Sequence, residues 1–143
     1  NALAPLCLCA RLKKTLVRRR GSDDSRPRFV VNVSAMEAKF HRRKTIYHPH
    51  TNMAKAALNM LTRTAAADYA RDGVYMNAVD TGWVNDERPL REAHRIHKEH
   101  HFQTPVDEVD AAARILDPVF SVLNETSPPT FGLFLKDYEP TDW

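Results

Sequence analysis

The spacing of apolar residues predicts three helices in this chain. Residues 3–18 carry leucines four positions apart, which is the spacing of one helical face: Leu8, Leu12 and Leu16. Residues 51–72 are rich in alanine and carry a second apolar stripe: Ala54, Leu58, Leu61 and Ala65. Thr51 is suited to cap the start of that helix and Gly73 to end it. A third helix is expected over residues 105–123, where acidic residues suit the positive N-terminal end: Asp107 and Glu108.

Short apolar runs between these helices predict strands over residues 29–34, 74–79 and 131–135. The first run is nearly unbroken and rich in β-branched residues, as in a strand buried on both faces of a parallel sheet. Strands that alternate with helices imply parallel pairing through right-handed crossovers. The pattern therefore predicts an α/β fold with a sheet of about three strands, flanked by helices.

A sheet this thin leaves one strand edge open. Unless something covers residues 29–34, their backbone donors and acceptors stay unpaired along a very apolar ribbon. We therefore expect another protein chain, or a second copy of this one, to cover the edge of strand 29–34.

The composition is that of one ordinary globular domain, with 43% hydrophobic and 27% charged residues in 143 positions. Because no apolar run reaches about 18 residues, no membrane insertion is expected and the protein is predicted to be soluble. Cys7 and Cys9 point to different helical faces, which argues against a mutual disulfide or a metal pair. A reducing compartment fits best, either the cytoplasm or the mitochondrial matrix.

The net charge of +3 is unevenly distributed, because basic residues gather between positions 13 and 44. Asp23 and Asp24 dilute this cluster, so a solvated loop is the favoured interpretation and nucleic acid is an unlikely partner. A patch for an acidic partner is the alternative.

Four segments, in order, resemble motifs of the second half of a short-chain dehydrogenase/reductase. They are residues 1–8, 30–35, 51–58 and 77–84. The first resembles the family's helix that opens with asparagine, and the second resembles the strand with the Asn-x-x-Ser motif. The third resembles the Tyr-x-x-x-Lys helix, and the fourth the Asn-x-x-x-Pro-Gly turn. The resemblance implies that the whole chain, residues 1–143, is an incomplete Rossmann-like domain corresponding to the C-terminal half, with residues 83–104 as a lid.

The resemblance also implies roles for individual residues around an NAD(P) cofactor. Asn1 matches the asparagine that holds a water molecule in the proton relay. Lys55 matches the lysine that lowers the pKa of the catalytic tyrosine and binds the nicotinamide ribose. Thr81, Gly82 and Val84 fall in the turn that meets the nicotinamide.

Two substitutions remove the usual proton relay. Thr51 stands at the position of the family's tyrosine and Ala35 at that of its serine. The aliphatic hydroxyl of threonine has far too high a pKa to exchange a proton at neutral pH, and alanine has no hydroxyl. His50 is the candidate for a displaced acid, although Pro49 is expected to hold its segment extended.

The Gly-rich turn that would bind the pyrophosphate of a dinucleotide is also absent. The chain alone is therefore expected to bind no cofactor, and NAD(P) would bind only with an N-terminal half supplied. The leading hypothesis is a catalytically degenerate protein that serves as a structural or interaction subunit. The alternative is an NAD(P)-dependent oxidoreductase whose N-terminal half is absent from this chain, which begins at Asn1 rather than at methionine.

Two further clusters favour structural interpretations. Histidines in the lid have a spacing that can bind zinc, yet charged neighbours favour a solvated helix and no metal: His94, His97 and His101. Aromatic residues are expected to pack the C-terminal tail on the sheet: Trp83, Phe134, Tyr138 and Trp143.

Overall fold

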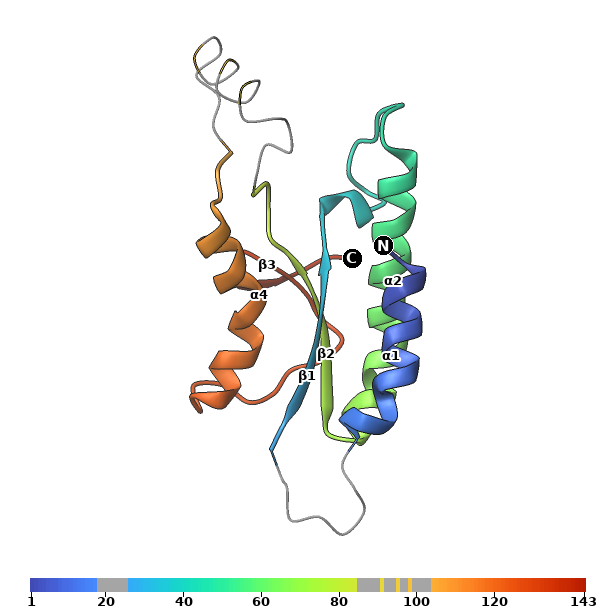
Figure 1. Cartoon of the computed structure of the whole chain (residues 1–143), viewed down its shortest axis with the longest axis vertical. Coiled ribbons are helices and arrows are strands. Elements are labelled where there is room, and N and C mark those ends of the chain that lie inside the picture. Colours follow the sequence, from blue (N-terminus) through green and yellow to red (C-terminus); the bar gives the residue numbers. More distant parts are fainter. Residues whose placement is uncertain (18–25, 85–90, 92–94, 96–97, 99–103) are drawn as a thin grey trace.

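The computed structural model describes residues 1–17, 26–84, 91, 95, 98 and 104–143. The elements are helix α1 (Leu3–Leu16), strand β1 (Arg28–Ser34), the short 3-10 helix η1 (Met36–Ala38), helix α2 (Pro49–Arg71), strand β2 (Val74–Asp80), helix α4 (Glu108–Leu123), strand β3 (Phe134–Lys136) and strand β4 (Glu139–Thr141). Helices α1 and α2 cover one face of the sheet and α4 covers the other (Figure 1).

The sheet has the order β1-β2-β3-β4, with β1, β2 and β3 parallel and β4 antiparallel to β3. The predicted α/β fold is confirmed, but the sheet has one strand more than the three expected. Asp137 and Tyr138 have φ values of 50° and 70° and reverse the chain between the last two strands. Tight hairpin turns need such positive φ values at both central positions. Asp137 is common at the first of these positions, but Tyr138 is unusual at the second, so the local sequence barely indicates this turn.

Strand β3 begins at Phe134, later than the predicted residue 131, because before it the Asn77 side chain takes part of the pairing beside two backbone hydrogen bonds, Gly132 N–H to the Met76 carbonyl and Ala78 N–H to the Leu133 carbonyl. Asn77 Nδ2 donates to the Thr130 carbonyl (2.9 Å), and the Leu133 N–H donates to Asn77 Oδ1 (3.0 Å). Gly132, with a φ of 68°, turns the chain between these two contacts.

Helix α2 begins at Pro49, two residues before the predicted Thr51, and Thr51 is not its cap. Proline suits the first turn of a helix because its φ is already helical and the missing N–H has no partner there. Gly73 follows the helix with a φ of 75°, as expected. The buried stripe is also rotated from the prediction and includes polar residues: Leu58, Asn59, Thr62, Ala66 and Tyr69.

Thr62 is buried because its hydroxyl has two partners. Its Oγ1 donates to the Leu58 carbonyl (3.0 Å) and accepts from Asn32 Nδ2 in β1 (2.9 Å). The resulting polar bridge fastens α2 to the first strand. Two polar side chains that hydrogen-bond to each other can be buried at little cost in free energy. A hydropathy pattern does not reveal such a buried pair.

The core under α1 and α2 joins both helices to the sheet. It contains Cys9, Ala66, Tyr69, Val74 and Met76. The Tyr69 hydroxyl donates to the Cys9 carbonyl (2.8 Å), so α2 and α1 are also linked by a buried hydrogen bond. Cys7 is exposed and Cys9 buried, which confirms that the two thiols point to different faces and form no disulfide.

The aromatic prediction for the C-terminal tail is only half correct. Phe134 is buried and stacks on Trp143 at a ring-centroid distance of 5.8 Å. Trp83 and Tyr138, however, are 55% and 49% exposed. Of the four rings, Phe134 and Trp143 thus stack on each other, and polar contacts of Lys39, Asp80 and Arg114 also hold the tail.

Most of the predicted lid, residues 83–104, lies outside the described residues, as do His94, His97 and His101. Among the residues that are described, no group of three metal-binding side chains occurs. In that same part of the chain, no helix is long and apolar enough to cross a membrane.

Candidate functional site

The residues singled out in the sequence gather at the C-terminal ends of β1 and β2. Ser34, the last residue of β1, pairs with Asp80, the last residue of β2. Ala35 and Thr81 therefore follow neighbouring strands at the same C-terminal end of the sheet. Lys55 reaches this edge from α2, where its Nζ donates to the Val33 carbonyl (2.8 Å). The fold therefore places Ala35, Lys55 and the Thr81–Gly82 turn around one end of the sheet.

The first turn of α2 has an unusual backbone. His48 precedes it in the left-handed region, with a φ of 56°. The N–H groups of Thr51 and Asn52 both donate to the His48 carbonyl, at 3.0 and 3.1 Å. The expectation that Pro49 holds His50 extended is wrong, because both residues belong to the helix and the His48 and His50 rings lie 6.2 Å apart.

Asn1 and Lys55 line the same cavity, which has a volume of about 470 Å³. The remaining walls come from α1, β1 and α2, and are mainly apolar. The structure thus brings together the two matching residues that the chain retains. Whether either acts on a ligand stays a prediction.

The neighbouring Ser34 does not take the place of a serine at position 35. The backbone of Ala35 is extended, so its side chain and that of Ser34 point in opposite directions. The Ser34 hydroxyl is buried, and no described residue is its hydrogen-bond partner. If Ala35 and Thr51 stand where the resemblance places the serine and the tyrosine, this end of the sheet has neither the serine hydroxyl nor the phenol of the usual relay.

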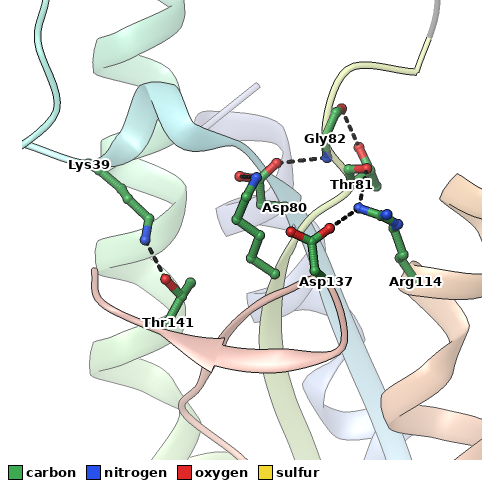
Figure 2. Close-up of polar contacts among 8 residues, drawn as sticks. Lys39, Asp80, Thr81, Gly82, Arg114, Asp137 and Thr141 are labelled. Atoms are coloured by element: carbon green, nitrogen blue, oxygen red, sulfur yellow. Dashed lines mark hydrogen bonds and ion pairs between the residues drawn. The ribbon is translucent and has the colours of Figure 1, made fainter. Parts of the chain in front are cut away.

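Asp80 shapes the Thr81–Gly82 turn, and sequence reasoning missed it. Its Oδ1 accepts the Gly82 N–H (2.9 Å), while Oδ2 accepts from Lys136 Nζ (2.9 Å). Figure 2 shows the Asp80 carboxylate facing the Gly82 backbone. Only 3% of the Asp80 side chain is exposed, and the Lys136 charge compensates the buried carboxylate. In the sequence, only the presence of an acidic residue at the end of a buried strand could have indicated this role of Asp80.

Arg114 holds the same turn from α4. Its Nη1 donates to the Thr81 carbonyl (3.3 Å) and forms an ion pair with Asp137 of the terminal hairpin (Figure 2). Gly82 has a φ of 77°, and a Cβ there would lie 3.4 Å from a Val106 methyl group and 3.5 Å from Arg114 Nη1. The turn is thus fixed on several sides, and no local pattern could reveal partners this distant in sequence.

Lys39 lies beside this site and is only 2% exposed. Its Nζ donates to Thr141 Oγ1 (2.6 Å) and lies 5.2 Å from the centre of the Phe134 ring. Burial lowers the pKa of the Lys39 amine, because a charged ammonium group loses water there. Lys39 joins the end of η1 to the terminal hairpin (Figure 2).

Comparison with known proteins agrees with this geometry. A family model described as enoyl-(acyl carrier protein) reductase matches residues 4–127, which is most of the chain. The chain is a member of the short-chain dehydrogenase/reductase family. An uncharacterized protein of Acanthamoeba polyphaga mimivirus is 37% identical over 110 residues, covering 71% of this chain and 22% of the viral protein.

Solved members of the family share the fold. The NADPH-bound carbonyl reductase from chicken fatty liver is 22% identical, with a TM-score of 0.65 over 100% of this chain and 54% of its own. A short-chain dehydrogenase/reductase from Burkholderia multivorans with bound NADP is 21% identical, with a TM-score of 0.62, and the match covers 100% of this chain and 52% of that one. The chain thus spans about half the length of these solved relatives.

Proposed function

We propose that this member of the short-chain dehydrogenase/reductase family is catalytically degenerate and serves as a structural or interaction subunit. The observation that carries the proposal is the pair of substitutions at the end of the sheet, Ala35 and Thr51. Neither side chain supplies an acid that works at neutral pH. A second deficit adds to this, because the chain has no Gly-rich turn for a dinucleotide pyrophosphate.

The open edge of β1 supports a partner. Within the described residues, β1 pairs only with β2, so its other edge is free along its length. The cavity of about 470 Å³ follows this edge, between α1 and residues 29–33. Leu8 and Leu12 line it and are 56% and 48% exposed, although leucines on the inner face of a helix are normally covered.

We assign this place to a strand from an N-terminal half of the fold, in the same polypeptide or in another. A strand beside β1 would pair the free backbone groups and cover both leucines. The solved relatives have nearly half of their length beyond the match to this chain, which is enough for such a unit. A second copy of the chain is the other occupant that the edge permits.

Cofactor binding would also depend on the N-terminal half of the fold. Lys55 would offer an amine and the Thr81–Gly82 turn would offer backbone groups on the nicotinamide side, and two similar solved structures carry NADPH or NADP. The pyrophosphate site would have to come from the added half. We therefore expect no NAD(P) binding by this chain alone.

One observation favours the alternative of an NAD(P)-dependent oxidoreductase. Asn1 and Lys55 line one cavity, and His50 lies in the first turn of the helix that carries Lys55. With an N-terminal half in place, NAD(P)H would supply hydride and His50 would supply the proton. A His50→Ala variant that kept the activity would remove His50 from this mechanism.

Sedimentation of the purified chain tests the structural proposal. Without the strand that we assign to it, the β1 edge should drive self-association of the isolated chain, and Leu12→Asp should weaken this association by placing a charge on the cavity wall. Leu6→Asp is the matched control, because Leu6 is also 48% exposed on α1 but does not line the cavity. A well-folded monomer, or equal effects of the two variants, would contradict the proposal.

A further inference from the structure

The segment from residue 38 to residue 67 contains no acidic residue. It carries six basic ones: Lys39, Arg42, Arg43, Lys44, Lys55 and Arg63. Three of these, together with three histidines, fall within residues 40–50, the segment that joins η1 to α2 and includes its first two residues. The three arginine and lysine charges of segment 40–50 equal the net charge of the whole chain.

Every residue of segment 40–50 is exposed. In the described part of the chain, no ion pair involves Arg42, Arg43 or Lys44. By contrast, the basic side chains Lys13, Arg114 and Lys136 all pair with aspartates. The charges of segment 40–50 are therefore available to an external anion.

Lys44 fixes the segment against the start of α2. Its Nζ donates to the Glu37 carbonyl (2.7 Å) and to Asn52 Oδ1 (3.2 Å). Asn52 Nδ2 in turn donates to the His48 carbonyl (3.1 Å). These contacts hold the basic segment at the N-terminal end of the helix.

That helix end is positive and has no acidic residue to compensate it. The first turn of α2 contains no aspartate or glutamate and has no side-chain cap. In α4 the corresponding positions are acidic, and Asp107 accepts the N–H of Asp110 (2.8 Å). The partial charge of the α2 terminus therefore adds to that of segment 40–50 instead of being neutralised.

We propose that segment 40–50, together with the first turn of α2, binds the phosphate group of a ligand. Guanidinium groups match phosphate oxygens in geometry, and a doubly charged phosphate gains more from several cations than a carboxylate does. The α2 terminus contributes its partial positive charge rather than free N–H groups, because the Thr51 and Asn52 N–H groups donate to the His48 carbonyl. The site lies one helical turn before Lys55, so the ligand phosphate would sit beside the candidate site.

Single-stranded nucleic acid fits the segment less well. The His48 and His50 rings meet edge to face, at an interplanar angle of 63°, and do not form parallel platforms for successive bases. Phe40 and Tyr47 are exposed aromatic side chains, at 87% and 67%, but the Tyr47 ring is tilted by 51° against that of His48, and no two rings of the segment are described as parallel. A small phosphate compound or a phospholipid headgroup could supply the phosphate.

Calorimetric titration of the full chain with inorganic pyrophosphate tests the proposal. We expect the double variant Arg42→Ser, Arg43→Ser to weaken binding at least tenfold and to melt like the wild type, since both side chains are exposed. The matched control is Arg11→Ser with Lys14→Ser, which removes the same charge from exposed positions on α1. Equal weakening by the two pairs would show a nonspecific charge effect and overturn the proposal.

Two further probes identify the source of the phosphate. Binding to vesicles that contain phosphatidic acid, but not to phosphatidylcholine vesicles, with the same dependence on Arg42 and Arg43, would support a lipid headgroup. Pyrophosphate binding without vesicle binding would support a small phosphorylated ligand. No binding to pyrophosphate or to either vesicle, or binding to an oligonucleotide alone, would overturn the proposal. These tests involve neither NAD(P) nor the β1 edge, so their outcome is independent of the proposed subunit function.

Discussion

At the residue scale, the least expected feature is the buried Lys39 amine. Desolvation is the main cause that lowers its pKa, and the neighbouring charges act in both directions. Arg42 and Lys136 lower the pKa further, while Asp142 and Asp80 raise it. Thr141 accepts a hydrogen bond from this amine, and the side chain is almost fully buried, so folding places a cation where water solvates it poorly.

The stability of the protein should therefore depend on pH through Lys39. Between the lowered pKa of the folded state and the ordinary value of 10.5, the unfolded chain binds more protons, so stability rises with pH in this window. Urea unfolding at pH 7 and pH 10 should show wild type gaining stability relative to Lys39→Met. The exposed variant Lys44→Met is the control, and its stability should change between pH 7 and pH 10 as that of the wild type does. Parallel behaviour of wild type and Lys39→Met would contradict this reasoning.

At the scale of elements, polar contacts decide how the helices lie on the sheet. The Tyr69 hydroxyl links α2 to α1, and Thr62 links α2 to Asn32 of β1. Leu58 was the only member of the predicted stripe that is fully buried. Apolar spacing was sufficient to predict a helix, whereas its orientation depends on partners that lie 30 to 60 residues away.

Removal of the Tyr69 hydroxyl should measure the link between the two helices. Tyr69→Phe leaves the buried Cys9 carbonyl without this donor, and we expect a loss of about 1 kcal/mol in the free energy of unfolding. Urea denaturation at neutral pH provides the measurement. Tyr75→Phe is the matched control, because no described contact uses the Tyr75 hydroxyl in a hydrogen bond. Equal losses in the two variants would show that the Tyr69 hydrogen bond is not responsible.

At the scale of the whole molecule, the substitutions at Ala35 and Thr51 are two separate changes at one edge of the sheet. They leave Lys55 and the Thr81–Gly82 turn in place, while the serine hydroxyl and the acidic phenol of the usual relay are missing. If these two positions are the reason for the lost activity, restoring the serine and the tyrosine should restore proton transfer in a protein that also contains the N-terminal, cofactor-binding half.

Restoring both side chains tests that view. In the protein completed by its N-terminal half, Thr51→Tyr with Ala35→Ser should raise NAD(P)H-dependent carbonyl reduction by about 100-fold or more, the usual contribution of a positioned acid. Thr51→Phe with Ala35→Ser is the control that lacks the phenol. Wild-type activity equal to that of the restored variant, and abolished by His50→Ala, would instead support the oxidoreductase alternative.

The sequence alone determined the family, the α/β class and the approximate places of the main helices and parallel strands. These follow from local periodicity and from motifs whose residues lie within a few positions of one another. Only the tertiary structure revealed the presence of the fourth strand, the Asp80–Lys136 ion pair, the hydrogen bond from Arg114 to the Thr81 carbonyl and the burial of Lys39. The last three depend on side chains that folding brings together from distant positions, whereas the fourth strand depends on positive φ values that Asp137 and Tyr138 rarely adopt. Local patterns carry no record of such contacts, because the free energy of a buried ion pair depends on its partner and its burial.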